Sequence, residues 1–220
     1  MLKLKPFIKE IQNEIYCIVK KPENFPEYYK GSDLDIFCYD IQSITKKLIA
    51  VGTTFVSSDY EIKLTNNNYQ QVYVDFVLSG SIEFRFDLYS QLPDYKNVNI
   101  TPALFESIIE NRIKIKIDRN IYYFVPNKID ESIIRYLEYH EWYKQRPDKI
   151  KHIDYILSHL TQNEMITFLA KLHHYTALPK YLDNVGGRKQ SDKNRIIQLL
   201  KTAYHKSSEF AKLAKTRIVR

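Results

Sequence analysis

Two aspartates, Asp33 and Asp35, form an Asp-x-Asp pattern in the segment DLDIFCYD, whose alternation is typical of a β-strand. Alternate side chains of a strand share a face, which puts the two Cα atoms about 7 Å apart with both carboxylates on one side. The carboxylates repel each other unless a cation or a basic side chain compensates them. Mg²⁺ is the usual cation for such oxygen ligands, held together with nucleotide phosphates. The alternative is a pair of aspartates at a strand entrance that contacts only water.

A third acidic residue, Asp87, lies 52 positions after Asp35 in the strand-like segment EFRFDLY. Apolar residues alternate with it, so we expect Asp87 on the polar face of its strand. On the core-facing side we expect Ile82, Phe84, Phe86 and Leu88. A third carboxylate on a neighbouring strand completes a two-metal site, in which the ions polarise an α-phosphate and activate the attacking hydroxyl.

These three aspartates are therefore our candidate catalytic residues and metal ligands, with two Mg²⁺ ions expected as cofactor. Glu83 and Asp75 are weaker candidates for the third carboxylate, because the same strand geometry brings them near the polar face.

The elements that position these side chains follow from hydrophobic periodicity. We expect a short amphipathic helix near residues 4–11, strands at 15–19, 33–40, 71–78 and 82–89, and a helix over 41–51 that ends at Gly52. Ser79-Gly80-Ser81 predicts a hairpin turn between the last two strands.

A second group of elements follows Pro102. We expect a helix over 104–111, strands at 114–118 and 120–125, and helices at 130–144, 149–160, 162–174 and 192–216, with Asp130 and Thr161 as helix caps. Pro126-Asn127 marks a boundary, because the pattern beyond it is helical throughout. The predicted fold class is α+β, with a mixed-sheet domain over 1–127 and a small helical bundle over 128–220.

The segments YKGSDLDIFC and EFRFDLY resemble the nucleotidyltransferase superfamily of the DNA polymerase beta type. VPNKIDESIIRYLEYHEWY extends the resemblance to a bacterial branch associated with polysaccharide biosynthesis, over roughly residues 10–155. The resemblance implies Mg²⁺-dependent transfer of a nucleoside monophosphate from a nucleoside triphosphate to a small acceptor such as a sugar or sugar phosphate. It also implies that Asp33 and Asp35 bind metal, and that Asp87 is a ligand and the base for the acceptor hydroxyl.

The position of the Gly-Ser pair departs from the superfamily pattern. Most members carry it about ten residues before the first aspartate, at a helix N-terminus that holds the triphosphate. Here Gly31-Ser32 directly precedes Asp33. We therefore expect the nucleotide-binding groups to be Lys20, Lys21, Lys30, Gly31 and Ser32, with Arg85 as a further phosphate contact. For Lys20 and Arg85 the alternative is a surface cation beside acidic residues.

Positive charge is concentrated at the end of the chain. Residues 186–220 hold ten basic and two acidic residues, so this segment carries +8 while the whole chain carries +7. Such a segment predicts a phosphate-bearing partner, and nucleic acid is expected to bind through residues 188–220. The alternative is the solvated face of a terminal amphipathic helix.

The N-terminus lacks a signal peptide and the apolar runs are far shorter than the roughly 20 residues of a membrane span, so we expect a cytoplasmic location without a membrane span. Cys17 and Cys38 are then expected as buried thiols. Two other functions stay open from the residues alone. One is a metal-dependent glycosyltransferase that uses Asp-x-Asp, and the other is a nucleotide- or nucleic-acid-binding protein with an inactive nucleotidyltransferase fold.

Overall fold

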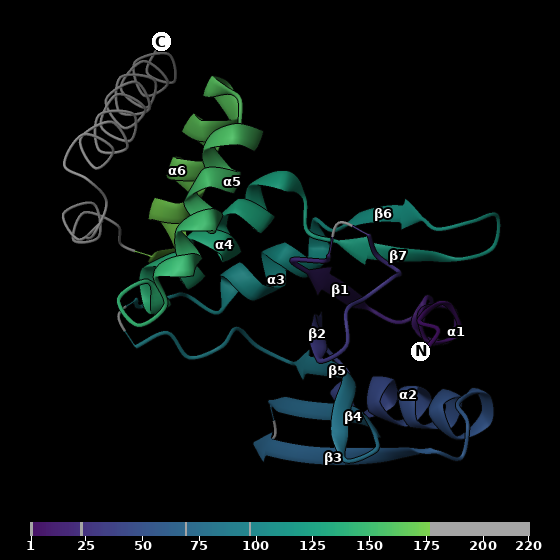
Figure 1. Ribbon diagram of the computed structural model, residues 1–220. Coiled ribbons are helices and arrows are strands. Elements are labelled where there is room, and N and C mark those ends of the chain that lie inside the picture. Colours follow the sequence, from purple (N-terminus) through teal and green to yellow (C-terminus); the bar gives the residue numbers. More distant parts are fainter. Residues whose placement is uncertain (1, 23, 69, 97, 177–220) are drawn as a thin grey trace, which may run out of the picture. The chain divides into compact units, whose positions relative to one another are not determined.

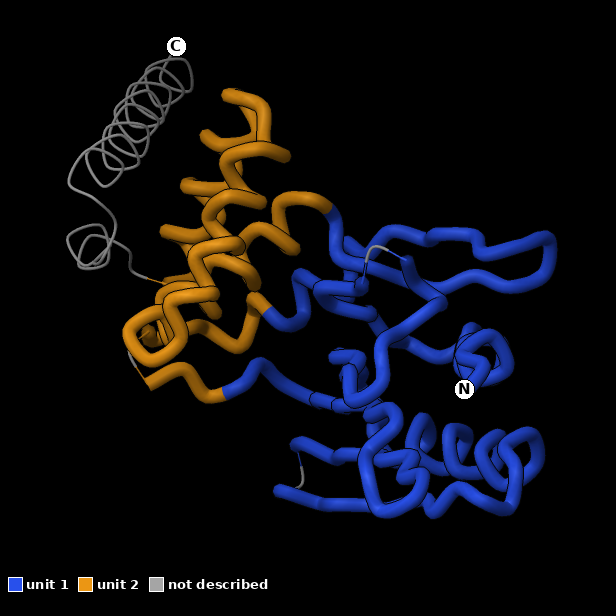
Figure 2. Tube along the Cα trace, in the orientation of Figure 1, with its two compact units in different colours: residues 1–93, 105–127 blue, residues 94–104, 128–220 orange. Residues whose placement is uncertain are grey.

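The computed structural model describes residues 2–22, 24–68, 70–96 and 98–176. The chain forms two compact units, shown in different colours in Figure 2. Unit 1 comprises residues 1–93 and 105–127, and unit 2 comprises residues 94–104 and 128–220. Residues 94–104, which the sequence analysis assigned to the first domain, are thus part of the second unit.

Unit 1 is built on a mixed five-stranded sheet with the order β1-β2-β5-β4-β3 (Figure 1). Its elements are α1 (Lys5–Ile11), β1 (Tyr16–Val19), β2 (Ser32–Cys38), α2 (Ile41–Phe55), β3 (Tyr60–Asn68), β4 (Gln71–Leu78) and β5 (Ser81–Tyr89). Strands β2 and β5 are parallel neighbours, and the other pairs are antiparallel. The α+β class is confirmed, and so are the predicted strands before and after the 79–81 turn.

One face of this sheet forms the core together with α1 and α2. Phe7 of α1 packs its ring 5.1 Å from Phe76 of β4, edge to face, and 5.4 Å from Phe86 of β5. Aromatic edge-to-face contacts of this kind add about 0.5–1.5 kcal/mol to the burial of the rings. The buried side chains that alternate along β2 and β5 are Leu34, Ile36, Cys38, Phe84, Phe86 and Leu88. The opposite face of the same strands is left for polar side chains.

Helix α2 continues past Gly52, which the sequence analysis took as its end. A Cβ atom at Gly52 would lie 2.6 Å from Ile62 Cδ1 and 2.7 Å from Phe76 Cε1. The glycine therefore permits close packing of the helix on the sheet and does not terminate the helix. The N-terminus is capped by Asp40, whose Oδ1 accepts a hydrogen bond from Ser43 N.

A β-bulge changes which side chains at the start of β5 are buried, contrary to our prediction. The β4–β5 register shifts between Phe76 and Val77, so that Val77 pairs with Ile82 and Glu83 becomes the extra residue. As a result Ile82 is 38% exposed, although the sequence analysis placed it in the core, and Glu83 is 6% exposed.

The turn between β4 and β5 has the predicted hairpin chemistry. Ser79 and Gly80 both have positive φ angles, 50° and 75°, as a two-residue turn between antiparallel strands requires. In the loop between β1 and β2 the Phe25–Pro26 peptide bond is cis.

The remaining part of unit 1 is a two-stranded hairpin of β6 (Ile113–Lys116) and β7 (Tyr122–Val125), preceded by α3 (Ala103–Glu110). Phe124 of β7 packs edge to face on Tyr16 of β1, with ring centroids 5.7 Å apart. Phe105 of α3 packs against Phe37 of β2 at 5.3 Å, on the sheet face that also carries the aspartates. Aromatic packing therefore closes one end of the otherwise polar face.

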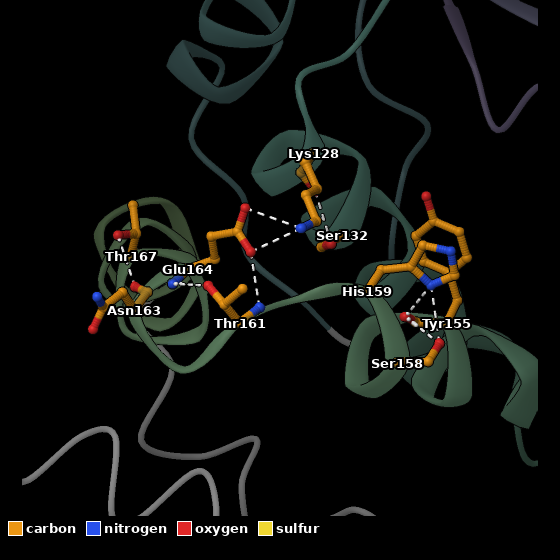
Figure 3. Close-up of polar contacts among 9 residues, drawn as sticks. All are labelled: Lys128, Ser132, Tyr155, Ser158, His159, Thr161, Asn163, Glu164 and Thr167. Carbon is orange, nitrogen blue, oxygen red and sulfur yellow. Dashed lines mark hydrogen bonds and ion pairs between the residues drawn. The ribbon is translucent and has the colours of Figure 1, made fainter.

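Unit 2 contains α4 (Lys128–Trp142), the 3₁₀ helix η1 (Pro147–Ile150), α5 (Lys151–His159) and α6 (Gln162–Thr176). The Thr161 cap is confirmed as a reciprocal capping box: Glu164 N donates to Thr161 Oγ1 and Thr161 N donates to Glu164 Oε2. Figure 3 shows Glu164 also accepting from Lys128. These bonds, that of Lys128 above all, lower the pKa of Glu164 to about 2.

Asp130 does not cap α4, contrary to our prediction. It lies inside the helix with no exposed surface and forms an ion pair with Lys171 of α6. The helix predicted at 192–216 and the basic segment 188–220 lie outside the described residues.

Cys17 and Cys38 are confirmed as buried thiols that form no disulfide. Burial, reinforced by Asp40 and Glu14, raises the pKa of Cys38 to about 12. Across the described ranges, no helix combines the length and apolar character that crossing a membrane requires.

Candidate functional site

Strand register brings Asp35 and Asp87 side by side on the polar face of the sheet. Asp35 of β2 pairs with Asp87 of β5, and Asp87 in turn pairs with Tyr73 of β4. Directly paired residues of neighbouring strands point to the same face, and the strands are about 4.8 Å apart. Two carboxylates from distant parts of the sequence therefore occupy adjacent positions, as the sequence analysis required of a metal site.

A second row of residues crosses the same face one pleat away. Asp33 of β2 pairs with Arg85 of β5, Arg85 pairs with Asp75 of β4, and Asp75 pairs with Lys63 of β3. Charges in this row alternate in sign, which is the favourable arrangement for cross-strand pairs. The row of Asp35 and Asp87, by contrast, has two like charges in direct succession.

Asp87 is the most strongly perturbed carboxyl group on this face. It is 7% exposed, and among the described residues its Oδ1 atom accepts no hydrogen bond. Burial, followed by the charges of Asp35 and Asp33, raises its pKa from the ordinary 3.8 to about 7, although Arg85 opposes the rise. A buried carboxylate oxygen without a hydrogen bond, beside a second carboxylate, is a position at which a cation is stabilising.

Lys20 supplies a positive charge to this row from outside the strands. Its Nζ lies 2.8 Å from Asp35 Oδ2, and the two side chains are 18% and 20% exposed. Lys20 directly follows β1, in which Val19 is the register partner of Asp35. We predicted a phosphate contact for Lys20, and the structure places its ammonium group on a carboxylate.

Arg85, the other predicted phosphate contact, is bound to Asp75. Its Nε and Nη2 donate to the two carboxylate oxygens of Asp75 at 2.6 and 2.9 Å, and its Nε lies 3.7 Å from Asp87 Oδ1. The guanidinium carbon also lies 4.6 Å from the ring centre of Tyr73. This bidentate geometry raises the pKa of Arg85 and holds the side chain against the sheet.

Gly31 and Ser32 form a turn whose donors bind the protein backbone. Gly31 N donates to Glu83 O at 2.9 Å, and its φ of 78° is a conformation that favours glycine. Ser32 N and Ser32 Oγ both donate to Tyr29 O, at 3.0 and 2.6 Å. Lys30, between them and Tyr29, is exposed.

The two weaker candidates for a third carboxylate have other partners. Glu83 accepts a hydrogen bond from the Tyr28 hydroxyl, which itself accepts from Leu2 N, so its side chain belongs to a buried polar group at the core. Asp75 is the bidentate partner of Arg85. The third carboxylate nearest in register to Asp35 is therefore Asp87.

Tyr73 and Tyr89 border the site, and the sequence analysis did not single them out. Burial and then the charge of Asp87 raise the pKa of Tyr73, and burial followed by Asp35 and Asp87 raises that of Tyr89. The signal for both was present in the alternation of the two strands, since residues 73 and 89 occupy the same face as Asp75 and Asp87.

The carboxylates of this face are the oxygen ligands that a divalent cation such as Mg²⁺ prefers. No group of three or more His, Cys, Asp or Glu side chains within the described ranges is arranged to hold a metal ion. Two carboxylates do fit, because Asp35 and Asp87 offer hard oxygen ligands in adjacent register and Asp87 Oδ1 accepts no hydrogen bond from the described residues. Asp33 shares their face and is exposed, with Arg85 as its register neighbour.

In comparisons with known proteins, no protein-family model matches the sequence. A search of curated proteins gives no match either.

Proposed function

We propose that this chain is an Mg²⁺-dependent nucleotidyltransferase. It transfers a nucleoside monophosphate from a nucleoside triphosphate to a hydroxyl group of a small acceptor, such as a sugar or sugar phosphate. The observation that carries the proposal is the register pairing of Asp35 with Asp87, whose buried Oδ1 accepts no hydrogen bond from the described part of the chain.

Bound Mg²⁺ supplies positive charge to the α-phosphate and to the departing pyrophosphate. The acceptor oxygen attacks the α-phosphorus, and the bond from that phosphorus to the oxygen bridging to the β-phosphate breaks. Asp87 accepts the hydroxyl proton, the role that the resemblance implies for it. Asp35 and Asp87 would hold the metal on the polar face, with Asp33 exposed on the same face.

The first test is binding of the four ribonucleoside triphosphates to the full chain by isothermal titration calorimetry with Mg²⁺. Binding of at least one nucleotide is expected, and absence of binding for all four would overturn the proposal. Pyrophosphate release is then measured with a panel of sugars and sugar phosphates. UDP-sugar hydrolysis is followed in parallel, because it would instead indicate a glycosyltransferase.

Asp35→Asn tests the assignment of the site. Pyrophosphate release is expected to fall by about 10²–10³-fold, since a charged group that stabilises the transition state is lost. The fold is expected to remain, because removal of a carboxylate beside Asp87 relieves repulsion. Asp59→Asn is the matched control, an exposed carboxylate ahead of β3, and its activity is expected to equal that of the wild type.

A nucleotide-binding protein without catalysis is the second candidate. The ion pair of Lys20 with Asp35 favours it, because an ammonium group already compensates one expected metal ligand. This candidate predicts nucleotide binding that does not require Mg²⁺ and no pyrophosphate release with any acceptor.

A further inference from the structure

Lys20 is held in a conformation that lysine rarely adopts. Its φ angle is 52°, in the left-handed region, where a side chain with a Cβ atom is disfavoured. Non-glycine residues persist in this region where the surrounding structure holds them, and they gather at functional sites. Here the conformation occurs one residue after Val19, the register partner of Asp35, and the side chain reaches Asp35.

The pairing with Asp35 differs from an ordinary surface ion pair. Nζ and Oδ2 are 2.8 Å apart, and about four-fifths of each side chain is removed from solvent. By comparison, Lys63 and Glu61 form a pair in which both side chains are more than half exposed. Partial burial reduces screening, so the ammonium group of Lys20 is a strong local charge.

The number of divalent ions that the polar face of the sheet can bind depends on how many of its carboxylates are already neutralised by basic side chains. The second row alternates Asp33, Arg85, Asp75 and Lys63 and is balanced in sign. In the first row Lys20 compensates Asp35, which leaves Asp87 as the carboxylate with an oxygen that accepts no hydrogen bond from the described residues. One or two carboxylates together with nucleotide phosphates are enough to hold one Mg²⁺.

We propose that Lys20 takes the place of one of the two divalent ions expected at this site, so that the chain binds a single divalent ion. This inference rests on the proposed function, because it concerns the same aspartates. The ammonium group neutralises Asp35, and the one ion is held at Asp87 on the carboxylate row, where nucleotide phosphates join its ligands when a nucleotide binds. The proposal differs from the sequence-based expectation of two Mg²⁺ ions in the number of ions and keeps the ligands.

The experiment is a Mn²⁺ titration of the full chain, with free Mn²⁺ measured by electron paramagnetic resonance and no nucleotide present. We expect one bound ion per wild-type chain and none after Asp87→Asn. Lys20→Met is expected to bind two ions, and Lys20→Arg, which keeps the positive charge, one. Lys46→Met removes an exposed lysine of α2 and is expected to bind one ion, as the wild type does.

Folding is monitored by circular dichroism, and Lys20→Gly provides a second test variant. Glycine relieves the left-handed backbone while removing the ammonium group, so it is also expected to bind two ions. Two ions on the wild type, or one ion on both Lys20→Met and Lys20→Gly, overturn the role of Lys20 and leave the proposed function standing. Absence of Mn²⁺ binding to the wild type and to every Lys20 variant overturns both.

Discussion

In unit 2 two carboxylates with little exposed surface each lie against a cation. Asp130, which has no exposed surface, is paired with Lys171, and Glu138 lies 3.0 Å from Lys149. In the sheet of unit 1, Asp87 is also buried, but its neighbour in register is the like-charged Asp35. Asp87 and Asp130 are thus buried in opposite electrostatic surroundings, whereas Asp75 of unit 1 resembles Asp130 in lying against a cation, Arg85.

This difference distinguishes a charged group that stabilises the fold from one that is suited to binding a ligand. A buried ion pair holds two helices in a defined arrangement, and its loss is costly because one charge stays behind. A buried like-charge pair stores repulsion that protonation, a basic side chain or a bound cation relieves. Lys20 pairs with Asp35, and Arg85 lies 3.7 Å from Asp87. Burial, followed by the charges of Asp35 and Asp33, still raises the pKa of Asp87 to about 7.

The largest effect is expected in unit 2. Asp130→Asn leaves Lys171 without its buried partner and is expected to lower the free energy of unfolding by about 2–4 kcal/mol. Urea unfolding at pH 7 measures the loss. Asp148→Asn breaks the exposed pair with Arg146 and is the control, with no measurable change expected. Equal effects of the two substitutions would contradict the structural role of the buried pair.

Arg85→Met is the corresponding change in unit 1. Asp75 loses both of its bonds from the guanidinium group, and we expect a loss of about 2 kcal/mol. The pKa of Asp87 is expected to rise further, because Arg85 holds it down. Carbon-13 NMR of the aspartate carboxyl groups measures the pKa, with Lys63→Met as control. An unchanged or lower pKa of Asp87 is the contrary result.

Asp87→Asn is expected to change stability in the opposite direction. The pKa of Asp87 is higher in the folded than in the unfolded state, so protonation of Asp87 stabilises the fold. This contribution to the free energy of unfolding is fully present below the unfolded-state pKa near 3.8 and is lost as the pH rises through about 7. Without divalent ions the free energy of unfolding of the variant should therefore be about 1 kcal/mol higher than that of the wild type at pH 8. This is a fraction of the roughly 3 kcal/mol by which two unit charges 5 Å apart repel each other at a dielectric constant of about 20.

Thermal unfolding with EDTA at pH 5 and pH 8 checks this prediction. The difference between Asp87→Asn and wild type is expected to be small at pH 5 and larger at pH 8. Asp59→Asn, at an exposed position ahead of β3, is the control and should show no such change between the two pH values. Destabilisation by Asp87→Asn at pH 8 would show that the carboxylate is adequately compensated.

The smallest effect is expected at the exposed capping box of α6. Thr161→Ala removes the cap on Glu164 N and is expected to cost about 0.5–1 kcal/mol. The pKa of Glu164 is lowered to about 2 in the folded state, so its ionised carboxylate stabilises the fold. This contribution to stability is present above the unfolded-state pKa and is lost only as the pH falls through about 2. Thermal unfolding at pH 4 and 7 tests this, with Thr167→Ala as control.

Much of the fold could be predicted because burial imposes a period on the sequence. The strands containing Leu34 and Phe84 alternate clearly, and α2 and α4 carry apolar stripes. Strand β3 was not predicted because it is an edge strand whose side chains are mostly exposed. Its sequence, which includes the segment TNNN, therefore shows no alternation of apolar and polar residues there. Gly52 was misread because its role depends on Ile62 and Phe76, which are distant in sequence.

The candidate site was predictable to the extent that strand alternation defines it. Asp35 and Asp87 could be assigned to one face from period-two spacing alone, and the structure pairs them. The contact of Lys20 was not predictable, because it depends on a left-handed residue in a loop without periodicity. The bulge at Glu83 could not be predicted from the sequence either. One extra residue in a strand moves the side chains of the residues before it to the opposite face of the sheet.

The parallel pairing of β2 and β5 also affects how the sheet assembles. A helix and two further strands separate them along the chain, so a long loop closes before they meet. Repulsion between Asp35 and Asp87 opposes that closure and leaves the local β4–β5 hairpin unaffected. We therefore expect dissolved cations that screen the two carboxylates to speed the docking of β5 onto β2, and the folding rate of this chain to depend on the ionic composition around it.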